Sequence, residues 1–196
     1  MYLEFSEISI YFAVELATIR MKRIYIIGYM GAGKSTFGKS LALRMNLKSI
    51  DTDHFIENRY RKKIGEIFAV EGEERFREIE HRVLLEISEY EDVVISTGGG
   101  LPCFNDNMTI MNNTGITVYL EAPVDELAIR LGASKNVRPV LEKRSGSALK
   151  DFIKENLARR ILFYEQAHIR FNSSSMNSNK EVKMIANSLE TLINKR

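Results

Sequence analysis

Apolar residues occur along this chain in two patterns: short runs rich in β-branched side chains, and longer stretches with helical spacing. The short runs predict five strands, at residues 24–28, 47–53, 93–97, 117–121 and 168–171. The second strand is expected to end in the sequence Asp51-Thr52-Asp53, and the third to run into three glycines.

The longer stretches predict helices at residues 34–45, 54–63, 65–90, 123–131, 147–167 and 182–192. In the helix at 65–90, Phe76, Ile79 and Val83 share one face, and an acidic cluster favours the N-terminal end. Strands that alternate with helices predict an α/β fold, a single domain with a five-stranded parallel sheet and helices on both faces. Ligands of such sheets bind beyond the carboxyl ends of the strands.

The first twenty residues differ from the rest. Glu4, Glu7 and Glu15 interrupt their apolar positions, so no transmembrane span is expected, and the features of a signal peptide are missing. Two interpretations remain open for residues 1–20: a stretch translated from a misassigned start, which we slightly favour, or an amphipathic extension packed on the domain or on a partner. The catalytic domain is expected to cover residues 21–196.

Composition narrows the possible partners. The 196 residues are 44% hydrophobic with a net charge of +2, which suits one globular domain and indicates neither a nucleic-acid nor a membrane partner. The single cysteine, Cys103, fits a reducing, cytoplasmic location and is expected to be an inert thiol. His54, His81 and His168 lack metal-ligand spacing. We expect a monomer.

The first predicted strand leads into a phosphate-binding loop. Gly28, Gly33, Lys34 and Ser35 fill every fixed position of G-x-x-x-x-G-K-[ST], between a strand and a helix. Backbone N–H groups and the helix N-terminus would hold the phosphates, Lys34 would reach the β- and γ-phosphates, and the Ser35 hydroxyl would ligate Mg²⁺. The nucleotide contacts are expected from Gly31, Ala32, Gly33, Lys34, Ser35 and Thr36. The chain is therefore expected to bind a nucleoside triphosphate.

Other motifs separate the classes of phosphate-loop protein. A regulatory GTPase needs an Asp-x-x-Gly switch and an Asn-Lys-x-Asp base reader, and an ATP-driven machine usually has an apolar strand ending in Asp-Glu. The sequence lacks all three. A kinase for a small alcohol remains, which needs Mg²⁺ ligands, a carboxylate at the acceptor hydroxyl, and cations at the transferred phosphoryl group.

The sequence Asp51-Thr52-Asp53 offers two carboxylates. At strand spacing i, i+2 they would point to the same side, one toward Mg²⁺ and one toward the attacking hydroxyl. The alternative is that Asp53 only caps the following helix.

Two arginines could bind a carboxylate-bearing substrate. Arg160 lies in or beside the apolar stripe of its predicted helix, where a cation needs a partner. Arg77 follows Phe76 on the long helix, and its alternative is pairing with Glu73, Glu74 or Glu80.

The polar and basic stretch at residues 132–147 predicts a mobile lid. It is bounded by Gly132 and Gly146, and Pro139 would hold Arg138 extended over the γ-phosphate on closure. The alternative is a solvated basic loop.

Together these segments resemble the shikimate kinase family, from about Lys22 to Asn172: GYMGAGKSTFG, the DTD strand end, GEERFREIE, STGGG, VRPVL and ARRILFYE. The resemblance implies a phosphate-loop kinase with a mobile lid that phosphorylates the 3-hydroxyl of shikimate with ATP and Mg²⁺, on the route to aromatic amino acids.

The resemblance also implies residue roles. Ser35 would bind Mg²⁺ directly and Asp51 through water, and Asp53 would orient the attacking hydroxyl. Lys34 and Arg138 would stabilise the transferred phosphoryl group, and Arg130 resembles an arginine that stacks on adenine. The substrate carboxylate would be held by Arg77 and Arg160, closed from the backbone side by Gly98, Gly99 and Gly100.

Two departures from the family pattern stand out. The interval from Arg130 to Arg138 is slightly longer, and the late loop at residues 172–179 carries no arginine, so adenine would be packed there by backbone or apolar contacts. Two other functions remain open: a kinase for another small hydroxy acid such as gluconate, and a non-catalytic nucleotide-binding module.

Overall fold

The computed structural model describes residues 22–133, 144–174, 176 and 178–194. The extension at residues 1–20, Arg138 and most of the predicted lid lie outside these residues.

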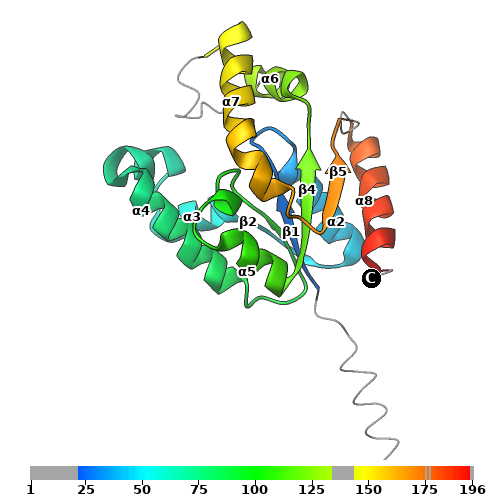
Figure 1. Cartoon of the computed structure of the whole chain (residues 1–196). Helices are drawn as coiled ribbons and strands as arrows, with labels where there is room; N and C mark the ends of the chain where they lie inside the picture. The colour runs from blue at the N-terminus through cyan, green and yellow to red at the C-terminus, as the bar shows by residue number, and fades with distance from the viewer. Residues whose placement is uncertain (1–21, 134–143, 175, 177, 195–196) are drawn as a thin grey trace, which may run out of the picture.

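Five parallel strands form one sheet, in the order β2-β3-β1-β4-β5 (Figure 1). The strands are β1 Arg23–Ile27, β2 Lys48–Asp51, β3 Val93–Ser96, β4 Ile116–Glu121 and β5 Ile169–Asn172. The predicted five-stranded parallel sheet is therefore confirmed. Because β1 lies at its centre and helices cover both faces, Ile24, Tyr25, Ile26 and Ile27 are all fully buried.

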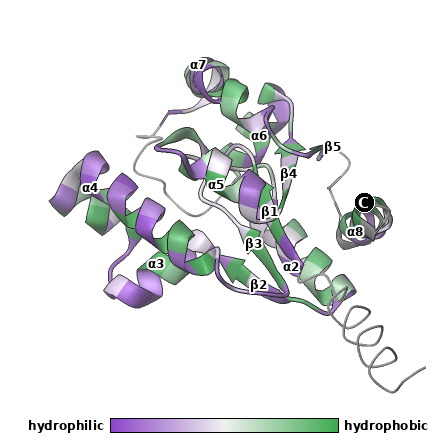
Figure 2. Ribbon diagram, turned by 60° about the horizontal axis from the view of Figure 1, so that its bottom comes forward, coloured by the Kyte–Doolittle hydropathy of each residue, from purple (hydrophilic) through white to green (hydrophobic). Residues whose placement is uncertain are grey.

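The helices are α2 Lys34–Met45, α3 Thr52–Tyr60, α4 Ile64–Ile87, α5 Asn107–Thr114, α6 Val124–Gly132, α7 Gly146–Tyr164 and α8 Asn179–Asn194, with a 3₁₀ turn, η1, at Leu101–Cys103. Figure 2 shows α2 and α8 on one side of the sheet and α4 and α5 on the other. The pair α6 and α7 packs together beyond the carboxyl end of β4 (Figure 1). In the described part of the chain, no helix is long and apolar enough to span a membrane.

The boundary between β2 and α3 differs from the prediction. The strand ends at Asp51, and Thr52 and Asp53 already belong to the first turn of the helix. Asp51 is the N-cap, since its side chain accepts hydrogen bonds from the Asp53 and His54 N–H groups. The expected strand spacing of the two aspartates was wrong, and so was the alternative in which Asp53 is the cap.

The long helix is bent. Within α4, Gly72 has φ 80° and ψ 172°, a left-handed backbone conformation that glycine adopts without a Cβ clash. The expected acidic cluster therefore flanks a kink in the middle of α4, not its N-terminus. Helix α5 and turn η1 were not predicted, because the polar sequence NMTIMNNT carries only a weak apolar pattern and is held by contacts with η1, β4 and α4.

Candidate active site

The phosphate loop connects β1 to α2, as the motif predicts. Lys34 begins α2, is only 8% exposed, and its Nζ donates a hydrogen bond to the Tyr29 carbonyl oxygen at 2.9 Å. The Ala32 N–H donates to the same oxygen at 3.2 Å. The loop thus turns back on itself and keeps the lysine ammonium beside its own backbone, as a phosphate site requires.

The loop also meets the end of β2. Ser35 Oγ donates a hydrogen bond to Asp51 Oδ2 at 2.5 Å, so a hydroxyl oxygen and a carboxylate oxygen lie next to each other beside the loop. Both are hard oxygen donors of the kind that Mg²⁺ prefers. The described residues contain no cluster of three or more His, Cys, Asp or Glu that could hold a metal by itself.

Three charged side chains approach the three glycines after β3. A Cβ atom added to Gly98 would lie 2.7 Å from Asp53 Oδ1, and one added to Gly100 would lie 2.6 Å from Arg77 Nη1. A Cβ on the glycine between them, Gly99, would lie 3.7 Å from Arg160 Nη1. Close approach by a side chain favours glycine at positions 98 and 100, whereas the 3.7 Å at Gly99 is an ordinary van der Waals distance.

The same turn abuts the phosphate loop. A Cβ on Gly99 would lie 3.2 Å from the Met30 backbone nitrogen, and the Gly98 N–H donates to Thr52 Oγ1 at 2.8 Å. The structure therefore gathers Asp53, Arg77 and Arg160 at one turn, beside the loop that carries Lys34.

Arg77 forms the ion pairs that its sequence position allows and also lies at the glycine turn. It pairs with Glu73 at 2.8 Å and with Glu80 at 2.5 Å, and it also faces Gly100. Its guanidinium carbon lies 4.1 Å from the centre of the Phe104 ring, a cation–π contact that restricts its motion. Pairing and site position are compatible because Arg77 has five N–H donors.

Glu80 is a site residue that sequence reasoning considered only as a possible partner of Arg77. Its side chain is 2% exposed, and a Cβ on Gly98 would lie 2.9 Å from its Oε1. Burial raises the pKa of Glu80 to about 7, although the Arg77 guanidinium acts in the opposite direction. The sequence did contain a feature that could have identified Glu80: its carboxylate lies beside the apolar face of α4, between Ile79 and Val83.

Arg160 lies on α7, half-buried, with its guanidinium carbon 5.5 Å from the centre of the Tyr29 ring. Four residues later, the Tyr164 hydroxyl donates to the Gly99 carbonyl oxygen at 2.6 Å. Tyr164 was predicted only as part of the apolar face of this helix. Nothing in the local sequence pairs it with a glycine 65 residues away.

Arg130 lies on the other side of the phosphate loop. Its Nη1 is 3.4 Å from the carbonyl oxygens of both Gly31 and Ala32, and its Nη2 donates to the Ser173 carbonyl oxygen at 3.0 Å. The late loop reaches the phosphate loop through Met176, whose Cε would lie 2.9 Å from a Cβ on Gly33. The late loop, which carries no arginine, thus contacts the phosphate loop through the apolar side chain of Met176.

Cys103 belongs to η1, directly after the three glycines. Burial raises the pKa of its thiol to about 11, although Arg160 and Arg77 act to lower it. The thiol stays protonated near neutral pH, as expected for an inert cysteine.

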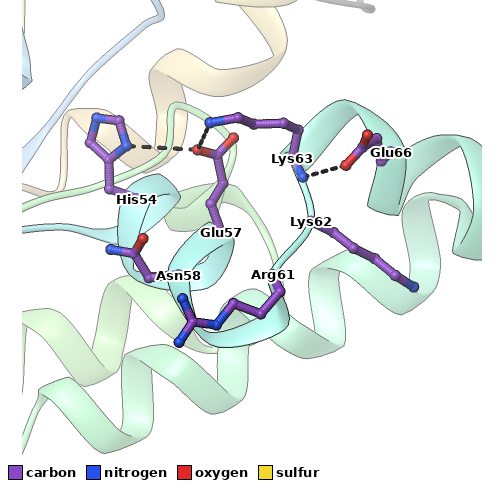
Figure 3. A pocket seen from close by; sticks show the side chains of 7 residues that line it. All are labelled: His54, Glu57, Asn58, Arg61, Lys62, Lys63 and Glu66. Atoms are coloured by element: carbon purple, nitrogen blue, oxygen red, sulfur yellow. Dashed lines mark hydrogen bonds and ion pairs between the residues drawn. The ribbon is translucent and has the colours of Figure 1, made fainter.

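A separate surface pocket lies between α3 and the start of α4 (Figure 3). One of its carboxylates is already bonded within the protein: Glu57 accepts hydrogen bonds from Lys63 Nζ at 3.0 Å and from the Ile64 N–H at 3.2 Å. Although burial acts to raise it, the pKa of Glu57 is lowered by these bonds. The pocket shares no lining residue with the site around Lys34 and Gly98–Gly100.

Known proteins resemble this chain closely. A family model described as shikimate kinase matches residues 30–190. A shikimate kinase of Parabacteroides distasonis is 52% identical over 173 residues, which is 88% of this chain and 100% of that relative. The crystal structure of shikimate kinase from Bacteroides thetaiotaomicron is 45% identical with a TM-score of 0.86, covering 89% of this chain and 99% of that one. Shikimate kinase from Acinetobacter baumannii, solved in complex with shikimate, is 32% identical with a TM-score of 0.80, covering 92% and 97%.

Proposed function

This chain belongs to the shikimate kinase family, and from that membership we propose that it transfers the γ-phosphoryl group of ATP to the 3-hydroxyl group of shikimate. The observation that carries this proposal is the turn Gly98–Gly100, where Asp53, Arg160 and Arg77 meet beside the phosphate loop. One carboxylate and two guanidinium groups match a substrate that carries hydroxyl groups and one carboxylate.

On the donor side, the phosphate loop residues 31–36 would hold the ATP phosphates. The buried ammonium of Lys34 lies 2.9 Å from the Tyr29 carbonyl oxygen. It would reach the β- and γ-phosphates and stabilise the charge that develops there in the transition state. Arg130, beside Gly31 and Ala32, would contact the adenine. We assign the second phosphoryl-stabilising cation to Arg138 in the lid, on the family motif alone.

Mg²⁺ fits the oxygen atoms of Ser35 and Asp51. When bound with the nucleotide, the ion supplies positive charge that neutralises the phosphate oxygens. The Ser35 hydroxyl would ligate it directly, and Asp51 would hold it through water.

On the acceptor side, Asp53 would accept a hydrogen bond from the attacking hydroxyl and orient it toward the γ-phosphate. Asp53 lies in the first helical turn of α3, which the Asp51 cap fixes. Its carboxylate is therefore held beside Gly98. Arg77 and Arg160 would bind the substrate carboxylate, with the Gly99 and Gly100 backbone closing the site.

An ADP-release assay with shikimate, gluconate and related hydroxy acids tests the proposal. ADP release that depends on shikimate supports it. Release with gluconate alone would assign a different acid, and nucleotide binding without release for any acceptor would indicate a non-catalytic module.

We further propose that the active unit is a cytoplasmic monomer formed by residues 21–196. A variant that begins at Met21 is then expected to keep the parental kcat and to elute as a monomer. Loss of activity in this truncated variant would show that residues 1–20 are needed for function and would contradict the proposal.

A further inference from the structure

Tyr164 connects two parts of the site that are distant in sequence. It is the last residue of α7, its side chain is fully buried, and its hydroxyl donates to the Gly99 carbonyl oxygen at 2.6 Å. The guanidinium group of Arg160, one helical turn earlier, lies close enough to this hydroxyl to act on its pKa. One oxygen atom is therefore bonded to the glycine turn and lies near one of the two arginines.

The bond to Gly99 fixes more than a carbonyl group. In a trans peptide the C=O of one residue and the N–H of the next are coplanar and point to opposite sides, and the described chain contains no cis peptide. With the Gly99 oxygen held by Tyr164, the Gly100 N–H must point away from α7. Gly100 is buried, and its N–H makes no hydrogen bond with the described part of the chain. A backbone donor in this position is available to a bound anion.

The hydroxyl can keep this geometry at any ordinary pH. Burial raises the pKa of Tyr164 far above its usual value, even though Arg160 acts to lower it. The phenol thus remains a neutral group that donates to Gly99 and keeps an oxygen lone pair available to Arg160.

We propose that Tyr164 is a positioning residue for the acceptor carboxylate. Its hydroxyl fixes the Gly100 N–H and the Arg160 guanidinium relative to each other, so that both donors meet the same carboxylate. This inference rests on the proposed function, because it assumes an acidic acceptor at the glycine turn.

A purely structural role is the competing explanation, and the neighbouring tyrosine provides a matched control. The ring of Tyr119 stacks on Tyr164 with the centres 5.2 Å apart, and Tyr119 is 2% exposed. Tyr164→Phe and Tyr119→Phe each remove one hydroxyl from the same stack and preserve its apolar surface. Only the first removes the bond to Gly99 and the oxygen atom near Arg160.

The experiment uses the full chain in a coupled ADP-release assay. Tyr164→Phe is expected to raise the KM for shikimate about tenfold, the effect of losing about one hydrogen bond to a charged site. The KM for ATP should stay within about twofold of the parental value, while Tyr119→Phe changes neither constant. A parental KM for shikimate in Tyr164→Phe, or equal increases in both KM values, would overturn the inference.

Two further measurements separate this inference from the proposed function. The ¹⁵N-amide resonance of Gly100 should shift in ligand-free Tyr164→Phe and stay in place in Tyr119→Phe, and an unmoved resonance in both contradicts the positioning role. This readout needs neither turnover nor shikimate. Absence of shikimate-dependent ADP release by the parental protein would instead reject the proposed function.

A double-mutant cycle tests the link through Arg160. If Tyr164 acts by holding this guanidinium, Tyr164→Phe should raise the KM for shikimate by a smaller factor in an Arg160→Ala background than in the parental protein. An equal rise in the KM for shikimate in both backgrounds would show that Arg160 is not held by Tyr164.

Discussion

Ser35 Oγ lies 2.5 Å from Asp51 Oδ2, while Oδ1 of the same carboxylate accepts a hydrogen bond from the Asp53 N–H at 3.1 Å. A single side chain therefore connects the phosphate loop to the first turn of α3. In the proposed reaction Asp51 would link the two reactants, because one of its oxygens lies beside the proposed metal ligand Ser35 and the other caps the helix that carries Asp53.

The two contacts of Asp51 can be separated by mutation. Asp51→Asn keeps a capping oxygen but loses the charge, so we expect a several-fold higher Mg²⁺ concentration for half-maximal activity and a nearly unchanged stability. Asp51→Ala should add a loss of about 1 kcal/mol in the free energy of unfolding, the usual cost of a missing N-cap. Urea titration and a Mg²⁺ titration of activity measure the two effects. Equal stability of the Asn and Ala variants would contradict the capping role.

Asp53 should matter for turnover and not for nucleotide binding. Asp53→Asn preserves the size of the side chain but removes the carboxylate at the acceptor hydroxyl. We expect kcat to fall by about 10²-fold or more, with the dissociation constant of ATP unchanged. Steady-state kinetics and calorimetry provide the two numbers. Turnover at the parental rate would reject the role of Asp53.

Gly100 tests the closeness of the Arg77 guanidinium. An added Cβ would lie 2.6 Å from Arg77 Nη1, so Gly100→Ala must displace the arginine from the site. We expect the KM for shikimate to rise by about 10²-fold, the scale of a misplacement of about 1 Å. The KM for ATP is the control, because Arg77 is assigned to the acceptor side of the site. A parental KM in Gly100→Ala would contradict the position of Arg77.

Glu80 should make the stability depend on pH. Its pKa is raised from 4.5 to about 7, mainly by burial, so the protonated form is favoured in the folded state. The stabilisation is complete below pH 4.5 and is lost as the pH rises through 7, by up to about 3 kcal/mol at 1.36 kcal/mol per pKa unit. Glu80→Gln lacks this titration. The difference in unfolding free energy between the parental protein and the variant should therefore change between pH 4.5 and 7.5, and urea titrations across this range measure it. A constant difference would mean that Glu80 does not titrate there.

Features that depend on neighbouring residues could be predicted from the amino-acid pattern alone. The apolar runs predicted all five strands, and the loop motif predicted the turn between β1 and α2 with Lys34 at the helix start. These patterns are local, since a strand or a helix needs a repeat over a few residues only.

Other features depended on contacts between distant segments. Which aspartate caps α3 was decided by where β2 ends, and α5 formed although its own sequence is only weakly amphipathic. The bond from Tyr164 to Gly99 and the burial of Glu80 against Gly98 come from the packing of α7 and α4 onto the turn after β3. The amino-acid pattern could not predict these contacts, because a side chain's partner and its exposure to water are set by the elements that pack around it. One linear pattern does not encode that arrangement.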